Sequence, residues 1–76
     1  MPTIARLGQC RITMYFLDHM PPHFHILAND GTEALVEIET LDVMQGNVDS
    51  RTLQQALNWA SANKDTLRAE WHRLNP

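Results

Sequence analysis

The side chains best suited to chemistry lie in one short stretch, Asp18-His19-Met20-Pro21-Pro22-His23-Phe24-His25. His23 and His25 are two residues apart, so on a β-strand both imidazole rings would project from the same face, about 6–7 Å apart. Two imidazoles at this spacing can chelate Zn²⁺ or another divalent transition-metal ion. The prolines before them restrict the backbone and would hold both rings in place at little entropic cost.

Three further residues are candidate metal ligands. The strand pairing described below places Glu37 opposite His23, where it could be a third ligand. His19, at the start of the turn, or His72, near the C-terminus, could be a fourth. The same histidines could instead act as general acids and bases without a metal, or belong to an interface. Asp18 has a simpler explanation, because an aspartate in a proline-containing turn commonly bonds the backbone of that turn.

Four strands are predicted around this turn, and each is rich in β-branched or aromatic residues. They cover residues 3–7, 10–17, 23–28 and 33–39. The segment Asn29-Asp30-Gly31 fits a three-residue hairpin loop with glycine in the left-handed position. This loop pairs Phe24 with Val36 and puts the apolar residues on one face, whereas a shift by one residue would reverse every side chain. Residues 40–48 are compatible with either a further short strand or a loop.

The second and third strands are predicted to be joined by Asp18 to Pro22, which pairs Phe16 with Phe24 and Met14 with Ile26. After the strands, apolar stripes at helical spacing predict two helices, one beginning near Asp49 or Ser50 and one near Asn63. We therefore expect one α+β domain over residues 1–76, a small antiparallel four-stranded β-meander followed by two C-terminal helices packed on one face. The core should contain Phe16, Phe24, Ile26, Val36 and Ile38, with His23 and His25 on the opposite face.

That opposite face is expected to mix large apolar side chains with polar ones, and a bare patch of this kind is unusual. Arg6 and Arg11 would also lie directly opposite each other and repel, which an acidic partner group would relieve. We therefore predict an interface, either with a second copy in a homodimer or with a small protein partner. Its candidate residues are Tyr15, Leu17, Leu27, Leu35, Arg6 and Arg11. The alternative is that the apolar residues are scattered surface hydrophobes, partly covered by residues 40–48.

Composition and charge narrow the function classes. The net charge is −3, and seven of the nine acidic residues lie between Ile12 and Ser50, a segment without Lys or Arg. Direct binding to nucleic acid needs clustered cations, so it is not expected. No apolar run approaches the roughly 20 residues that span a membrane, and the N-terminus lacks the features of a secretory signal. The single cysteine, Cys10, fits a reducing compartment, so a cytoplasmic location is predicted.

Several short motifs together resemble a known family. Met1-Pro2-Thr3-Ile4, Arg6, Gly8, Arg11 and above all Asp18-His19-x-Pro-Pro-His23-x-His25 resemble the small bacterial family called domain of unknown function 4160. The similarity runs along nearly the whole chain, including Asp30-Gly31 and residues 67–71. It implies a bacterial origin and a gene that neighbours another small gene, in an arrangement like a toxin–antitoxin pair. It implies no activity. Thr13, Met14 and Glu37 stand where relatives commonly carry basic or aromatic residues, which weakens a nucleic-acid-cleaving interpretation.

Three functional hypotheses follow, and whether the protein is an enzyme stays open among them. The first is a protein-interaction module, for example one half of a toxin–antitoxin-like gene pair, that uses the sheet face bearing the histidines. The second is a small histidine- or metal-dependent hydrolase or nuclease centred on His19, His23 and His25. The third is a metal-binding protein without catalysis.

Overall fold

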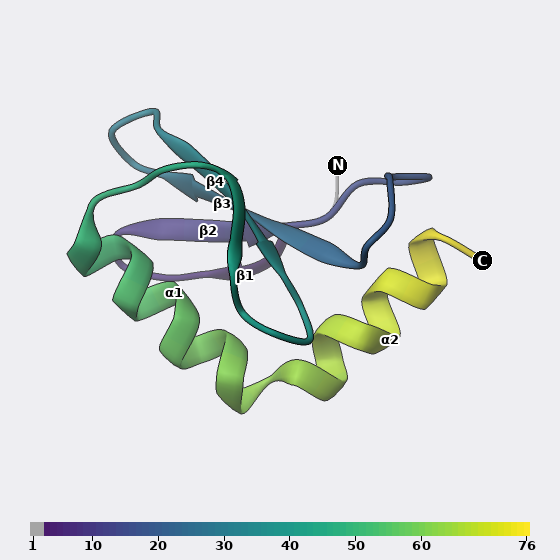
Figure 1. Ribbon diagram of the computed structural model, residues 1–76. Helices are drawn as coiled ribbons and strands as arrows, with labels where there is room; N and C mark the ends of the chain where they lie inside the picture. Colours follow the sequence, from purple (N-terminus) through teal and green to yellow (C-terminus); the bar gives the residue numbers. More distant parts are fainter. Residues whose placement is uncertain (1–2) are drawn as a thin grey trace.

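The computed structural model describes residues 3–76 and consists of an antiparallel sheet with two helices on one of its faces (Figure 1). Met1-Pro2, which opens the family-like N-terminal motif, lies outside the described residues. Five strands follow one another in sheet order: β1 (Thr3–Arg6), β2 (Cys10–Thr13), β3 (His23–Ala28), β4 (Glu33–Glu37) and β5 (Val43–Gly46). The helices are α1 (Ser50–Ala62) and α2 (Lys64–Leu74).

The α+β class and the C-terminal helix pair are confirmed, with one strand more than predicted. Residues 43–46 form β5, which pairs antiparallel with β4 at the edge of the sheet. The ambiguous segment 40–48 is therefore part turn and part strand. Asp49 caps α1 as expected, because its carboxylate accepts a hydrogen bond from the backbone N–H of Thr52 at 2.8 Å. No helix within residues 3–76 is both long enough and apolar enough to cross a bilayer.

The hairpin of β3 and β4 has the predicted register. Phe24 pairs with Val36 and Ile26 with Ala34, and the Ala28 N–H donates to the Thr32 carbonyl across the three-residue loop at 2.9 Å. Gly31 in that loop has a φ of 91°, the left-handed conformation that the loop requires of it. The prediction that His23 and His25 share one face of β3 therefore holds.

The pairing of β2 with β3 differs from the prediction by two residues. Ile12, not Met14, lies opposite Ile26, because β2 ends at Thr13 and the connection to β3 takes all of residues 14–22. A shift by two keeps every side chain on its predicted face, so Met14 still points into the core. Phe16, however, lies in the connection rather than in the strand. The prediction that Phe16 is buried is wrong, since 67% of it is exposed.

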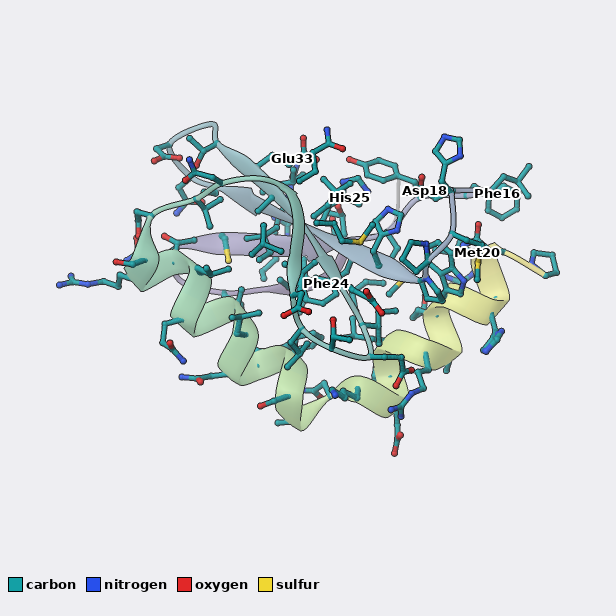
Figure 2. The ribbon with its side chains drawn as sticks, in the orientation of Figure 1. Phe16, Asp18, Met20, Phe24, His25 and Glu33 are labelled. Carbon is teal, nitrogen blue, oxygen red and sulfur yellow. The ribbon has the colours of Figure 1, made fainter. Side chains whose placement is uncertain are left out.

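The core lies between the sheet and the helices, where Figure 2 shows Phe24. Its buried residues come from the core-facing sides of β2, β3 and β4, from three positions outside the strands and from one stripe of each helix: Cys10, Ile12, Met14, Phe24, Ile26, Ala34, Val36, Ile38, Val48, Ala56, Ala60, Leu67, Trp71 and Leu74. The stripe predicted for α2, Leu67, Trp71 and Leu74, is buried as expected.

The long connection between β2 and β3, residues 14–22, is fastened to the end of α2. The N–H of Leu17 donates to the carbonyl of Leu74 at 3.3 Å, and the N–H of Asp18 donates to Oδ1 of Asn75 at 2.6 Å. Leu17 has a φ of 54°, an unusual conformation for a branched residue. This turn brings Asp18 back toward the start of β3.

Candidate metal centre

His25, Asp18 and Glu33 lie on the side of the sheet away from the helices (Figure 2). The Nε2 atoms of His23 and His25 approach one oxygen of Asp18, Oδ2, at 3.0 and 3.2 Å. The two imidazole rings have their centroids 5.3 Å apart. These three side chains offer ligand atoms that all lie within 4.8 Å of one another. The histidine pair of β3 and the carboxylate of the 14–22 connection thus form one cluster.

The Nδ1 atom of each ring has an acceptor of its own. Nδ1 of His23 lies 2.8 Å from the carbonyl oxygen of Pro21, and Nδ1 of His25 lies 2.9 Å from Oε2 of Glu33. A carbonyl oxygen can only accept hydrogen bonds, so Nδ1 of His23 carries a proton and donates it to Pro21. In a neutral His23, Nε2 is then a lone pair directed at Asp18. Both nitrogens of His25 face carboxylate oxygens, so at least one of them carries a proton.

A lone pair directed at a carboxylate oxygen is unfavourable. A second proton on the buried His23 ring would remove the conflict, and so would a cation between the three atoms. The unfavourable contact is clearest at His23, which is buried. Its side chain is only 3% exposed, and its Nε2, although 3.0 Å from Asp18, is not aligned for a hydrogen bond and has no hydrogen-bond partner among residues 3–76.

Asp18 is held in its ionised form. Burial by itself raises the pKa of this carboxyl group. A hydrogen bond from the His19 N–H, a hydrogen bond from His25 and the nearby charges of His23 and His25 lower the pKa by more than burial raises it. The resulting pKa lies below the ordinary aspartate value. Oδ1 accepts the bond from the His19 N–H at 2.8 Å, which is the local backbone bond expected from the sequence. Oδ2 therefore remains free to face the two histidines.

Two aromatic rings fix the orientation of the imidazoles. The ring of Tyr15 meets His25 edge to face at a centroid distance of 4.4 Å, and Trp71 of α2 meets His23 at 5.3 Å. Packing of this kind leaves few alternative rotamers, so the donor atoms are positioned before any ligand arrives.

Comparison with known protein families gives one match. The family model described as domain of unknown function (DUF4160) matches residues 10–72, a range that includes all three clustered side chains. The chain belongs to the DUF4160 family. Comparisons with curated proteins and with solved structures give no match.

The ligand candidates predicted for this DUF4160 chain separate into two groups. His23 and His25 are brought together, and Asp18, which sequence reasoning treated as a turn residue, joins them. Glu37 does pair with His23 across the strands, but it is not part of the cluster within 4.8 Å. His19 and His72 are exposed, in the 14–22 connection and on α2 respectively.

The residues predicted for an interface are spread over the same face of the DUF4160 sheet. Arg6 and Arg11 lie directly opposite each other, as expected. Leu27 and Leu35 are partly buried. Tyr15 and Leu17 were predicted to lie in the second strand, but β2 ends at Thr13 and both lie in the connection. The ring of Tyr15 contacts His25, and Leu17 is 74% exposed.

Proposed function

We propose that this protein binds one divalent transition-metal ion through Oδ2 of Asp18 and the Nε2 atoms of His23 and His25. The observation that carries the proposal is that both Nδ1 atoms already have a hydrogen-bond partner while both Nε2 atoms lie near the same carboxylate oxygen. A cation between the three atoms turns the unfavourable contact at His23 into coordination. Neutral imidazoles with a protonated Nδ1 are the usual form of histidine ligands.

The spacing of the donors is close to that of a metal site. In a tetrahedral site, bonds of roughly 2.0–2.2 Å from a metal ion place neighbouring ligand atoms about 3.3–3.6 Å apart. The distances from Asp18 Oδ2 to the two Nε2 atoms, 3.0 and 3.2 Å, are slightly shorter than that. Two imidazoles and one carboxylate suit Zn²⁺ or Fe²⁺ better than Mg²⁺ or Ca²⁺, which prefer oxygen ligands alone. Pro21 and Glu33 supply the outer hydrogen bonds that such histidines commonly make.

A metal-dependent hydrolase or nuclease is the second candidate function. Three protein ligands leave at least one coordination position, as in catalytic zinc sites, where the metal lowers the pKa of a bound water. Asp18, His23 and His25 would hold the metal in that case. The hydrolase predicted from the sequence therefore keeps a defined centre, with Asp18 in the place assigned there to His19.

The predictions of origin, gene arrangement, location and interaction that were made from the sequence are part of the same proposal. A bacterial origin and a toxin–antitoxin-like gene pair are supported by the family resemblance, and a cytoplasmic location by the lone, buried Cys10. The interaction role, with a homodimer or a small protein partner, is supported by a separate feature, the exposed apolar side chains of the 14–22 connection.

The first prediction tests metal binding. The wild-type chain should bind one Zn²⁺ per chain in native mass spectrometry, and its melting temperature should rise with free Zn²⁺, because the ion binds only the folded chain. His23→Ala, His25→Ala and Asp18→Asn should each lose both effects. Lower pH should weaken binding, since protons compete for the ligand atoms.

His72→Ala is the matched control, because it removes an exposed histidine outside the cluster, and it should behave as the wild type. Circular dichroism of each variant without metal shows whether it still folds. A wild-type chain that takes up no stoichiometric metal would refute the proposal, and so would folded His23→Ala and His25→Ala variants that bind as before.

A further inference from the structure

The connection of residues 14–22 displays the three most exposed large hydrophobic side chains among residues 3–76. Phe16 is 67% exposed, Leu17 74% and Met20 73%. They flank Asp18 and His19 in the sequence, and Figure 2 shows Phe16 and Met20 beside Asp18 at one end of the molecule. Clustered apolar side chains on a small protein commonly mark a contact surface. This surface adjoins the proposed metal centre.

The proposed metal centre has one protein ligand fewer than a structural zinc site. Structural zinc sites use four protein ligands, and the cluster of Asp18, His23 and His25 supplies three. The next residue after Asp18, His19, carries an imidazole that is exposed and makes no side-chain hydrogen bond among residues 3–76. His19 does not join the cluster of its own chain. In the sequence it lies between two of the exposed apolar residues, Leu17 and Met20.

We propose that a second copy of this chain docks on the 14–22 connection and that its His19 supplies the fourth ligand. The contact would be two-fold symmetric, so each copy donates His19 to the other and the dimer holds two metal ions. This inference rests on the proposed function, since it completes the same centre. It also assigns the centre to the closed, structural class of metal sites.

The contact area is too small to hold the dimer together without metal. Three side chains of this size offer on the order of 400 Å² per copy, about half of the roughly 800 Å² that each partner buries in a standard interface. Charge opposes association as well, because the net charge of each chain is −3. Two divalent metal ions reduce the charge of the dimer from −6 to −2 and add two coordinate bonds between the chains. Without them the chain should be a monomer.

Sedimentation velocity with and without Zn²⁺ tests the inference. The wild type should be a dimer with one Zn²⁺ per chain, and a monomer in EDTA. His19→Ala should still take up Zn²⁺ through the remaining three ligands but should sediment as a monomer. His72→Ala removes the other exposed histidine and should dimerise as the wild type does.

Mixing two variants that cannot dimerise alone gives a more specific test. His19→Ala keeps the three-ligand cluster but has no imidazole to donate, whereas His23→Ala can donate His19 but has a broken cluster. Neither should dimerise alone. Together they should form a heterodimer with a single Zn²⁺ per two chains, which native mass spectrometry can identify if one variant is isotopically labelled.

Three results would overturn the inference and leave metal binding intact: a wild type that binds Zn²⁺ and stays a monomer across a wide range of protein concentration, a His19→Ala variant that dimerises with Zn²⁺, or a dimer that survives EDTA. The first of these would favour the hydrolase, because the fourth position would then be open to water. A wild type that binds no metal overturns the inference and the proposed function together.

Discussion

Three of the four ring nitrogens of the β3 histidines have a hydrogen-bond partner, whereas Nε2 of His23 has none among residues 3–76 although it lies 3.0 Å from Asp18. His25 lies between two carboxylates, with Glu33 at Nδ1 and Asp18 at Nε2. When Nδ1 donates to Glu33, Nε2 is left to coordinate a metal ion. At the scale of single residues, Glu33 decides how well His25 serves as a ligand.

Glu33→Gln should weaken Zn²⁺ binding by about tenfold, the lower end of what loss of an outer hydrogen-bond partner costs. The amide still accepts a hydrogen bond but no longer adds negative charge to the imidazole. Glu37→Gln is the matched control, because Glu37 lies on the same strand, faces the same side and pairs with His23 without bonding to it. Competition titration against a chelator measures both affinities, and equal losses in the two variants would show that only the overall charge matters.

The register of β3 against β4 was predicted correctly because two independent constraints agree there. The loop ending at Gly31 sets the register, and only that register places Phe24 and Val36 on the same face. No short loop sets the register of the pairing of β2 with β3, so the apolar pattern was the only constraint there. A shift by two residues preserves every face, so the apolar pattern cannot distinguish the two registers, and Phe16 resembles a core residue in both.

Asp18 was assigned to the turn alone for a related reason. Its carboxylate reaches the histidines because the chain leaves β2 early and Leu17 adopts a positive φ, a conformation that nothing in the sequence pattern indicates for leucine. The histidine spacing was a local signal and could be interpreted from the sequence. The third ligand depends on the path of a nine-residue connection, residues 14–22, and on bonds to the far end of the chain.

The pairing of β4 with β5 depends on one glycine. Gly46 has a φ of 75°, and a Cβ atom there would overlap the backbone carbonyl oxygen of Glu33. Gly46→Ala should therefore destabilise the fold by about 3 kcal/mol, the sum of the left-handed backbone cost and a backbone clash. Urea unfolding measures the loss.

Gly31→Ala provides the comparison, because Gly31 also has a positive φ but a Cβ there would meet no atom within 4 Å. This variant should lose only about 1 kcal/mol, the backbone cost alone. Similar losses for both variants would contradict the proposed clash at Gly46.

At the scale of the whole molecule, α2 is tied to the turn after β4 by one ion pair and one hydrogen bond to the backbone, as well as to the core by its apolar stripe. Arg68 donates to both carboxylate oxygens of Glu39, at 2.7 and 3.0 Å, and Lys64 donates to the carbonyl of Glu39 at 2.8 Å. The hydrogen bond from Arg68 is the main reason why the pKa of Glu39 lies below its ordinary value of 4.5. Both side chains are substantially exposed, so the pair contributes modestly to stability.

Acid should remove this contribution. Since folding lowers the pKa of Glu39, the added stability is present above pH 4.5 and is lost as the pH falls through the lower, folded-state value. Arg68→Gln should therefore be less stable than the wild type at pH 6, and the difference should shrink as the pH falls toward 3. Urea midpoints across this range measure the effect.

Arg51→Gln is the control, because Arg51 forms no ion pair among residues 3–76, and its profile should run parallel to that of the wild type. If the Arg68→Gln deficit stays constant with pH, the ion pair is not its cause.

The bond between Asp18 and Asn75 has a consequence for the order of events during synthesis. The two residues are 57 positions apart, so His23 and His25 leave the ribosome long before the side chain that anchors Asp18 exists. A nascent chain that lacks the end of α2 lacks two of the bonds that hold the 14–22 connection, those of the Leu17 and Asp18 N–H groups, although Asp18 can still bond to His25. Docking of the last helix therefore completes the anchoring of Asp18 beside the two histidines.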